Sequence, residues 1–407
     1  MDERLLRIDE ALALVLQVAG GRLGEELVAV DDGLDRTLAA DVLAAGDSPR
    51  FDCSAMDGFA LGPGPTPGDF QIRGESRAGM PYAGAALAQG EAVRISTGAA
   101  VPAGAAAVVR QEDTSAIAGD GPLRVLVEVA PGANVRAAGE DMLTGALILA
   151  EGTRLGPAEL GAAAAAGAAE LTVARRPVLA VVCTGDELRE PGAALGPGEI
   201  HNSNDPMLRA LAARAGAVAG AAGRVGDDPA QTEEVLGRAL DGADVLVVSG
   251  GVSVGEHDHV KSALGRLGVV EHFWGVALQP GRPTWFGSRG GKLVFALPGN
   301  PVSVAVTFSL FARPAVEALL GARRSRRLRP QARLARPVRR NTVRDQAIRV
   351  TLELRAGELV ATPTGKQDSH MLTSLVRADS LALIPSGDGE LPAGSAVRLE
   401  PLPGCQL

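Results

Sequence analysis

The chain has 407 residues, of which 46% are hydrophobic and 22% charged, and its formal net charge is −8. This length is enough for about two to four domains, and the acidic balance disfavours nucleic acid as a partner. The three cysteines are too widely spaced for a disulfide framework or a zinc site, and no signal peptide or membrane-spanning run is recognisable, so we expect a cytoplasmic protein without a membrane partner.

The N-terminal part is predicted to contain a helix and a small β domain. Apolar residues recur at helical spacing over residues 4–18. Short Val- and Ile-rich runs, separated by Gly and Pro, then predict strands at 27–30, 92–95, 106–109 and 123–129, with a loop at 62–69. Helical composition returns at 157–169. We therefore assign 1–26 and 137–176 to an elongated helical or linker domain and 27–136 to a β domain.

Strands and helices alternate over residues 177–322, which predicts βαβ units around a parallel sheet. The strand runs are 178–183, 244–249 and 293–297, and the helical runs are 205–215, 231–240 and 304–310. Each strand run ends in a polar, Gly-rich motif. Ligands of such sheets bind at the carboxyl ends of the strands, so we expect the binding site at that edge.

An arginine-rich stretch begins at residue 323 and marks the start of the last domain, 323–407. A solvated linker or an anion-binding strip explains the arginines of 323–340. Short alternating runs then predict a small β-barrel or sandwich: 348–354, 359–362, 380–384 and 396–399. The predicted fold class is multidomain, α/β and β, with a parallel-rich α/β domain, an N-terminal helical segment plus β domain, and a C-terminal β-barrel.

The segment 249–258, SGGVSVGEHD, carries the strongest chemical signal. After Ser249 it contains three glycines, a hydroxyl and two acids, at Gly250, Gly251, Ser253, Gly255, Glu256 and Asp258. Glycines let backbone N–H groups approach an anion, and carboxylates suit a hard cation such as Mg²⁺. A tight turn with solvated charges is the alternative, but acids placed directly after the glycines favour a phosphate bridged to a metal.

A second pair of motifs is TGDEL at 184–188 and HNSND at 201–205. The first again follows a strand. In the second, Asn204 or Asp205 taken alone is more simply a helix cap. Next to another glycine-and-acid strand end, the pair also suggests a shared ligand crevice.

The loops QPGRP at 279–283 and LPGNPVS at 297–303 are stiffened by proline. Rigidity holds donors in place for an oxyanion, and Arg282 and Ser303 are candidate donors. The alternative is a stiff turn that enters a helix with Ser303 as its cap.

Two upstream acidic segments, SAMDG at 54–58 and GED at 139–141, are ordinary turn patterns on their own. The five histidines are too scattered to predict a zinc site. No Ser–His–Asp or Cys–His arrangement and no Walker motif can be assembled.

Together and in order, these motifs resemble those of the MoeA family, which includes the gephyrin E domain. The matching segments are 51–60, 95–102, 136–142, 183–188, 200–205, 248–261, 279–287, 296–304 and 364–375. They span nearly the whole chain, and SAMDG, GGVSVGEHD and LPGNPVS are the specific ones.

The resemblance implies a molybdopterin molybdenumtransferase, which inserts molybdate into adenylylated molybdopterin, releases AMP and requires Mg²⁺. It implies a homodimer whose active site lies between the α/β domain of one subunit and the N-terminal and barrel regions of the other. It also suggests the adenylyltransferase of the same pathway and molybdoenzymes as protein partners.

The resemblance also assigns roles to individual residues. The implied catalytic acids are Asp57, Asp141, Glu187, Asp227 and Asp258, and the implied metal ligands are Asp57, Glu256 and Asp258. The implied pterin-, phosphate- and molybdate-binding residues are Thr184, Gly185, Ser249, Gly250, Gly251, Ser253, Gly255, Pro280, Arg282, Pro298, Asn300, Pro301, Ser303, Arg349 and Ser369. Asp227 rests on the resemblance alone.

The sequence departs from the family pattern at four positions. Phe59 stands where Tyr is usual, Cys53 where Asn is common, Asp368 where Gly is usual and Gln279 where many relatives have Lys. The last two bear on molybdate affinity. Two other functions stay open: adenylylation of molybdopterin, whose enzymes lack the SAMDG segment and the barrel, and a non-catalytic scaffold, which no additional domain supports.

Overall fold

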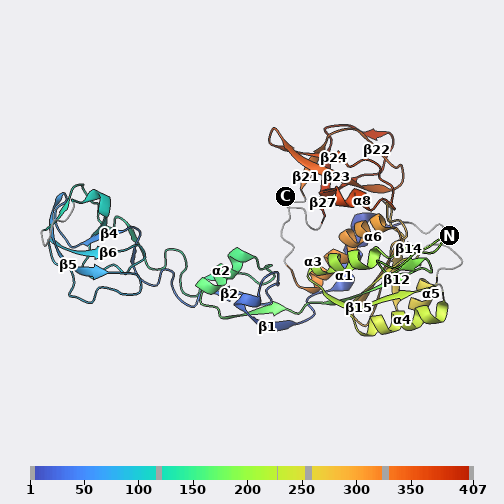
Figure 1. The fold of residues 1–407 in the computed structure, drawn as a ribbon, viewed down its shortest axis with the longest axis horizontal. Helices are drawn as coiled ribbons and strands as arrows, with labels where there is room; N and C mark the ends of the chain where they lie inside the picture. The colour runs from blue at the N-terminus through green and yellow to red at the C-terminus, as the bar shows by residue number, and fades with distance from the viewer. Residues whose placement is uncertain (1–4, 116–121, 227, 253–258, 323–329, 403–407) are drawn as a thin grey trace. The chain divides into compact units, whose positions relative to one another are not determined.

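The computed structural model describes residues 5–115, 122–226, 228–252, 259–322 and 330–402 (Figure 1). The chain forms two compact units. The α/β–barrel unit comprises Met1–Glu26, Asp35–Ala39 and Val173–Leu407, and the β unit comprises Leu27–Leu34 and Ala40–Thr172.

The β unit is built on a five-stranded sheet with strand order β7-β4-β6-β5-β8. Its strands are β4 (Gly58–Leu61), β5 (Gly68–Ser76), β6 (Glu91–Ile95), β7 (Ala107–Arg110) and β8 (Leu123–Val125). Two-stranded ladders add β2 (Val42–Leu43) with β10 (Leu147–Leu149), β3 (Cys53–Ser54) with β9 (Val135–Arg136), and β1 (Glu25–Ala29) with β11 (Glu170–Ala174). The helix α2 spans Pro157–Ala165.

A six-stranded sheet with order β15-β12-β16-β20-β19-β17 forms the centre of the α/β–barrel unit. The parallel strands are β12 (Val178–Thr184), β15 (Val218–Val225), β16 (Val245–Ser249) and β20 (Lys292–Leu297). The antiparallel strands are β17 (Val270–Trp274) and β19 (Trp285–Arg289). The predicted parallel-rich sheet is therefore confirmed.

Helices pack on both faces of this sheet. The helices are α1 (Ile8–Ala19), α3 (Asn204–Ala215), α4 (Pro229–Asp241), α5 (Val260–Arg266), α6 (Pro301–Thr307) and α7 (Arg313–Leu319). Alternate side chains of β16 belong to two different hydrophobic cores, because successive side chains of a strand point to opposite faces of the sheet. Val245 and Val247 pack with α1, α3, α6 and α7, whereas Leu246 and Val248 pack with α4 and α5.

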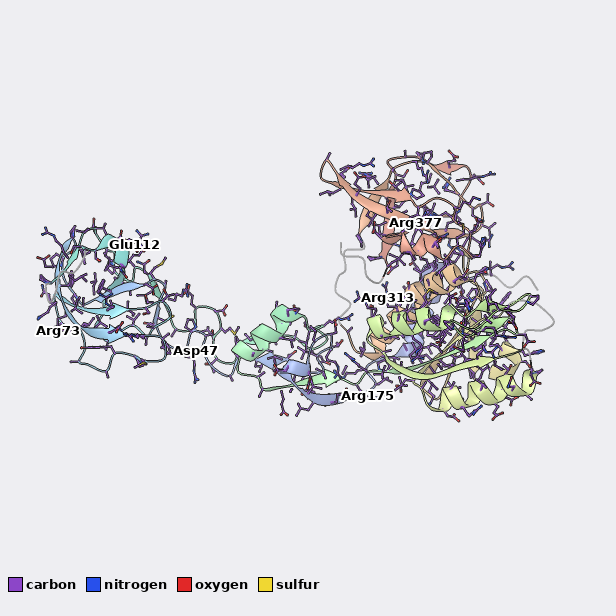
Figure 2. The ribbon with its side chains drawn as sticks, viewed as in Figure 1. Asp47, Arg73, Glu112, Arg175, Arg313 and Arg377 are labelled. Carbon is purple, nitrogen blue, oxygen red and sulfur yellow. The ribbon has the colours of Figure 1, made fainter. Side chains whose placement is uncertain are left out.

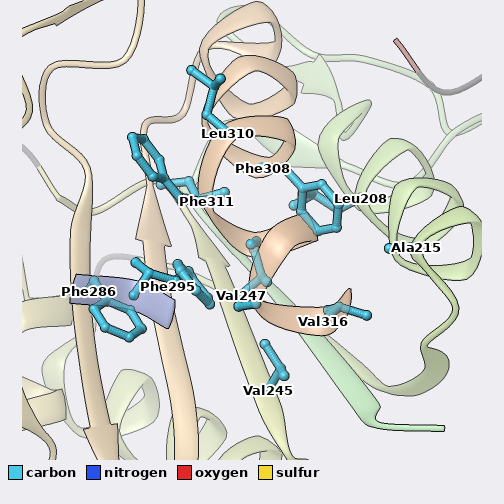
Figure 3. Close-up of a cluster of buried hydrophobic side chains, with 14 of the residues drawn as sticks. Leu208, Ala215, Val245, Val247, Phe286, Phe295, Phe308, Leu310, Phe311 and Val316 are labelled. Atoms are coloured by element: carbon cyan, nitrogen blue, oxygen red, sulfur yellow. The ribbon is translucent and has the colours of Figure 1, made fainter. Parts of the chain in front are cut away.

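The central helical run, Pro301–Leu319, contains a π-helical turn at Phe308–Ala312 between α6 and α7. Its length and apolar composition would allow a membrane span, but 78% of it is buried inside the unit, as in the core helix of a globular domain. Phe308 and Phe311 are fully buried in the same hydrophobic cluster as Phe286 and Phe295 of the sheet (Figure 3).

We expect Phe311→Ala to lower the free energy of unfolding by about 3–5 kcal/mol, because it leaves a cavity in a close-packed core. Urea denaturation measures this loss. The control is Val376→Ala at a side chain that is 84% exposed, for which a change within about 0.5 kcal/mol is expected. Equal effects of the two substitutions would contradict the assigned core.

The C-terminal strands close into a five-stranded barrel, β23-β24-β21-β27-β25, because β25 pairs again with β23. The strands are β21 (Gln331–Leu334), β23 (Asp345–Arg355), β24 (Glu358–Pro363), β25 (Ser380–Ile384) and β27 (Ala396–Pro401). Strand β18 (Leu278–Gln279) adds to β23 in parallel. The predicted barrel is therefore confirmed, and the helix α8 (Thr373–Val376) and the ladder of β22 (Val338–Arg339) with β26 (Glu390–Leu391) complete it.

Charged pairs brace this unit at two places labelled in Figure 2. Arg313 of α7 pairs with Glu400 of β27, which ties the central helix to the barrel. The guanidinium of Arg175 binds both carboxylate oxygens of Asp244, at 3.0 and 2.9 Å. The backbone N–H of Val178 donates to the same carboxylate at 2.8 Å, so this pair fixes the start of β12.

Three sequence expectations differ from the structure. The helix expected at 304–310 begins at Pro301 and continues to Leu319, because proline suits the first helical position. The loop expected at 62–69 ends earlier, since β5 begins at Gly68. The linker interpretation of the arginine-rich stretch is wrong from residue 331, where Ala332 and Leu334 alternate into the barrel core and make this segment a strand.

Candidate active site

Three Gly-rich motifs lie at one edge of the parallel sheet. Residues Cys183, Ser249 and Leu297 occupy matching positions on the neighbouring strands β12, β16 and β20. The turns that follow these strands therefore start side by side. Their residues are Thr184, Gly185, Ser249, Gly250, Gly251, Pro298, Gly299 and Asn300.

The approach of these turns requires glycine at position 250. Gly250 has a φ of +96°, and a Cβ there would lie 2.6 Å from Thr184 Oγ1 and 2.9 Å from the Thr184 carbonyl oxygen. Its N–H donates to the Leu297 carbonyl at 3.0 Å. Gly251 has a φ of +65°, and a side chain there would collide with Val260. The sequence places glycines here so that three backbone segments can meet closely.

Asn204 ties two of the turns together. Its Nδ2 donates to Ser249 Oγ at 2.9 Å and to the Gly299 carbonyl at 2.7 Å. Interpreting Asn204 or Asp205 as the helix cap is therefore wrong. Helix α3 has Ser203 at its N-cap position, and the backbone N–H of Asp205 is bound by Asn202 Oδ1 at 3.2 Å.

The LPGNPVS loop reaches the barrel through Asn300. Asn300 Nδ2 donates to Ser369 Oγ at 3.0 Å, and the Val302 N–H donates to the Ser369 carbonyl at 3.1 Å. Ser303 lies inside α6 and is 4% exposed. The alternative in which Ser303 caps this helix is wrong, since the N-cap position belongs to Asn300. Pro298 and Pro301 flank the loop and limit its motion.

Arg282 follows Pro280 in a second loop near the barrel and is exposed. No other residue within the described ranges forms a hydrogen bond or ion pair with its guanidinium. The neighbouring Gln279 is engaged differently, because its Oε1 accepts from Asn341 Nδ2 at 2.9 Å. Arg282 is therefore the cation of this loop that is available to an anion.

Arg349 is fully buried beneath the loop 366–369. Its Nε donates to Ser374 Oγ at 3.0 Å, and its Nη1 and Nη2 donate to the Gln367 and Asp368 carbonyls, each at 3.1 Å. Burial lowers the pKa of this guanidinium, and the carboxylate of Asp368 opposes that shift. The geometry gives Arg349 a positioning role, because it shapes the loop that carries Ser369.

Replacing Arg349 with leucine is expected to lower the free energy of unfolding by about 3 kcal/mol, because three carbonyls and a hydroxyl lose a buried donor. Chemical denaturation tests this. Arg355→Leu, on the same strand, is the control, since the Arg355 side chain is 57% exposed and about 0.5 kcal/mol or less is expected. A mild effect at both positions would contradict the positioning role.

Asp57 belongs to the β unit and is exposed at the start of β4. Its Oδ1 accepts from the backbone N–H of Thr97 at 2.7 Å and from Thr97 Oγ1 at 3.0 Å. These bonds hold the pKa of the Asp57 carboxyl below its usual value, so it is ionised at neutral pH. Asp141, in the same unit, is exposed, and its N–H donates to the Ser48 carbonyl at 2.9 Å.

The remaining predicted residues are placed unevenly. Glu187 is exposed just after β12, beside Gly185. Five predicted residues lie outside the described residues: Asp227, Ser253, Gly255, Glu256 and Asp258. Within the described ranges, no group of three or more His, Cys, Asp or Glu side chains could hold a metal ion. Burial raises the pKa of the Cys183 thiol, just below the strand ends, to about 12, which leaves it protonated at neutral pH.

Sequence reasoning missed Thr97 and Gln367 as well as the role of Asn204. Thr97 stands in the Ser96–Gly98 turn after β6, whose motif is too short to be specific. Gln367 Oε1 accepts from the Arg349 backbone N–H at 2.8 Å. Only their position in the motifs of the resemblance could have singled them out.

Comparison with known proteins covers nearly the whole chain. Residues 6–167 match the MoeA N-terminal region (domain I and II), residues 180–318 a probable molybdopterin-binding domain, and residues 331–402 the MoeA C-terminal region (domain IV). The chain is 33% identical to the molybdopterin molybdenumtransferase of Bacillus subtilis, over 96% of this chain and 93% of that protein. It is 37% identical to molybdopterin molybdenumtransferase 2 of Mycobacterium tuberculosis, over 89% and 91% of the two chains.

A solved structure is similar along its whole length. The molybdopterin biosynthesis MoeA protein of Pyrococcus horikoshii is 29% identical and superposes with a TM-score of 0.81, covering 97% of this chain and 99% of that one. The sequence matches and this structure agree in all three regions, so the chain belongs to the MoeA family of molybdopterin molybdenumtransferases.

Proposed function

We propose that the chain inserts molybdate into adenylylated molybdopterin and releases AMP. As a family member it is a transferase of molybdenum cofactor biosynthesis. The observation that supports this substrate is the meeting of three Gly-rich strand ends, which Asn300 connects to the loop that carries Ser369. Arg282, in a separate loop, adds an exposed cation. Backbone donors of such turns suit phosphate oxygens, and a guanidinium suits an oxyanion.

The residues divide into two groups in this proposal. The strand-end group binds the pterin and its phosphates: Thr184, Gly185, Ser249, Gly250, Gly251, Ser253 and Gly255. The loop group holds molybdate: Pro280, Arg282, Pro298, Asn300, Pro301, Ser303 and Ser369, with Arg349 shaping the loop. Glu187, Asp141 and Asp227 are the further acids of the site.

Mg²⁺ is the proposed metal. It is usually bound by one or two carboxylates together with substrate phosphates rather than by a protein cage. Asp57 fits this description, since it is exposed and Thr97 engages only one of its carboxylate oxygens. Glu256 and Asp258 are the other proposed ligands. When bound, Mg²⁺ would neutralise charge on the pyrophosphate.

A homodimer is also proposed, with Asp57 of one subunit completing the site of the other. The β unit supports a second copy as its partner. Leu43 and Leu147 are cross-strand neighbours on β2 and β10, and both are 55% exposed. Contiguous exposed apolar patches mark faces that another chain covers. The proposed location is the cytoplasm. The proposed protein partners are the adenylyltransferase of the same pathway and molybdoenzymes.

The purified chain should convert adenylylated molybdopterin and molybdate into molybdenum cofactor and AMP in the presence of Mg²⁺. Consumption of ATP and molybdopterin instead would identify an adenylyltransferase and refute the proposal.

Mixing inactive Asp57→Ala and Gly250→Ala subunits tests the dimer. A site shared between subunits restores about a quarter of the wild-type activity, because random exchange makes half of all dimers mixed and every mixed dimer has one intact site of two. A mixture that stays inactive although subunits exchange would exclude a shared site.

A further inference from the structure

A chain of side-chain amides joins the strand-end turns to the barrel. Asn204 Nδ2 binds Ser249 Oγ and the Gly299 carbonyl, at 2.9 and 2.7 Å. Asn300, which follows Gly299 in the sequence, donates from Nδ2 to Ser369 Oγ at 3.0 Å. The connection therefore runs without a gap from the end of β16 to the loop that Arg349 shapes.

Both amides lie at the start of a helix and neither caps it. Asn204 is the first residue of α3, whose Asp205 N–H is served by Asn202. Asn300 occupies the N-cap position of α6 and makes no side-chain cap bond. An asparagine at such a position ordinarily binds its own helix. Here both side chains reach to other segments instead.

The orientation of the Asn204 amide is fixed by its partner. A carbonyl oxygen can only accept, so the atom that faces Gly299 O must be the nitrogen. This orientation leaves Asn204 Oδ1 buried without a hydrogen-bond partner within the described ranges. Both hydrogen bonds that this amide donates therefore go to segments other than its own helix.

We propose that Asn204 and Asn300 form a positioning relay that sets the separation between the Ser249–Gly251 turn and the Ser369 loop, and so aligns the two substrates. This inference rests on the proposed function, because it concerns the same site. Asn204 does not need to touch the reacting atoms, since misplacement of a positioned group by about 1 Å is enough to slow a reaction about 100-fold.

A double-mutant cycle on the full-length protein tests the relay. Asn204→Ala and Asn300→Ala are each expected to lower kcat by about 10- to 100-fold. The double variant should be no worse than the weaker single variant, because either change breaks the same connection. Losses that multiply would show two independent contacts and overturn the relay.

The pH dependence of activity in Asn204→Asp is a further test, because a purely structural role of Asn204 would leave this dependence unchanged. The ionised carboxylate turns an oxygen toward Gly299 O, whereas the protonated acid donates again. The ratio of variant to wild-type activity is therefore expected to rise as the pH falls. A ratio that stays constant with pH contradicts the assigned bond.

Hydrogen exchange tests the relay without relying on catalysis. Asn204→Ala is expected to speed exchange of the Val302 amide, which binds the Ser369 carbonyl. Ser288→Ala is the control, since it removes a similar bond of 2.8 Å to His272, beside Leu293 at the opposite end of β20 from the LPGNPVS loop. Unchanged Val302 exchange in Asn204→Ala overturns the relay. Faster exchange in a protein whose wild type transfers no molybdenum supports the relay and refutes the proposed function.

Discussion

Asp57→Ala is expected to lower kcat for molybdenum insertion by about 100-fold or more, with little change in folding. Thr97 fixes one carboxylate oxygen through two hydrogen bonds, and the Asp57 residue is exposed. Removal of the side chain would delete a proposed Mg²⁺ ligand whose direction is already set. Steady-state release of AMP at saturating Mg²⁺ measures the loss.

The β unit offers a matched control for this substitution. Asp47 Oδ1 accepts from the N–H of Thr144 at 2.8 Å and from its Oγ1 at 2.6 Å, which is the same arrangement as at Asp57. Threonine bonds hold the pKa of both carboxyls below the usual value. Any stability from either bond is therefore present at neutral pH and is lost only as the pH falls through the folded-state pKa. Asp47→Ala should keep full activity, and a matching loss in both variants would assign Asp57 a structural role.

Gly250→Ala is expected to abolish turnover and to destabilise the α/β–barrel unit. The added Cβ would lie 2.6 Å from Thr184 Oγ1 and 2.9 Å from the Thr184 carbonyl oxygen. The backbone also has a φ of +96°, where an L side chain is strained by about 1–3 kcal/mol. Separation of β12 from β16 at their ends would open the proposed phosphate cradle. Thermal denaturation and AMP release are the two measurements.

Gly291→Ala separates strain from collision. Gly291 lies in the turn between β19 and β20 of the same sheet, has a φ of +82°, and a Cβ there would meet no atom within 4 Å. The Gly291→Ala variant should lose stability through backbone strain alone and keep its activity. An active Gly250→Ala protein, destabilised no more than Gly291→Ala, would show that the strand ends tolerate a wider separation.

The sequence predicted the central strands closely because of where they lie. Strands β12, β16 and β20 are covered on both faces, so they read as continuous apolar runs. Strand β15, VAGAAGRV, gave no such signal, because it is a sheet-edge strand of small residues that are mostly exposed. Edge position and alanine content remove the pattern on which strand prediction depends.

The candidate site was only partly predictable for a related reason. Glycines after strands are visible in any sequence, and their clustering follows from a parallel sheet. The partners of Asn204 are 45 and 95 residues away, so no local pattern distinguishes its role from capping. Arg349 likewise looks like an ordinary strand arginine until the loop 366–369 is folded over it.

The helical run Pro301–Leu319 starts at the LPGNPVS loop and ends deep in the core, with Phe308 and Phe311 on its π-helical turn. A continuous helix that shifts along its axis moves the residues at its start. The position of Asn300 should therefore depend on the volume of the side chains several turns further along the helix. Laboratory evolution toward a different oxyanion would then select substitutions in this apolar interior as well as at the loops. Variants with altered tungstate tolerance, for example, are expected to carry changes around Phe311 that never contact the ligand.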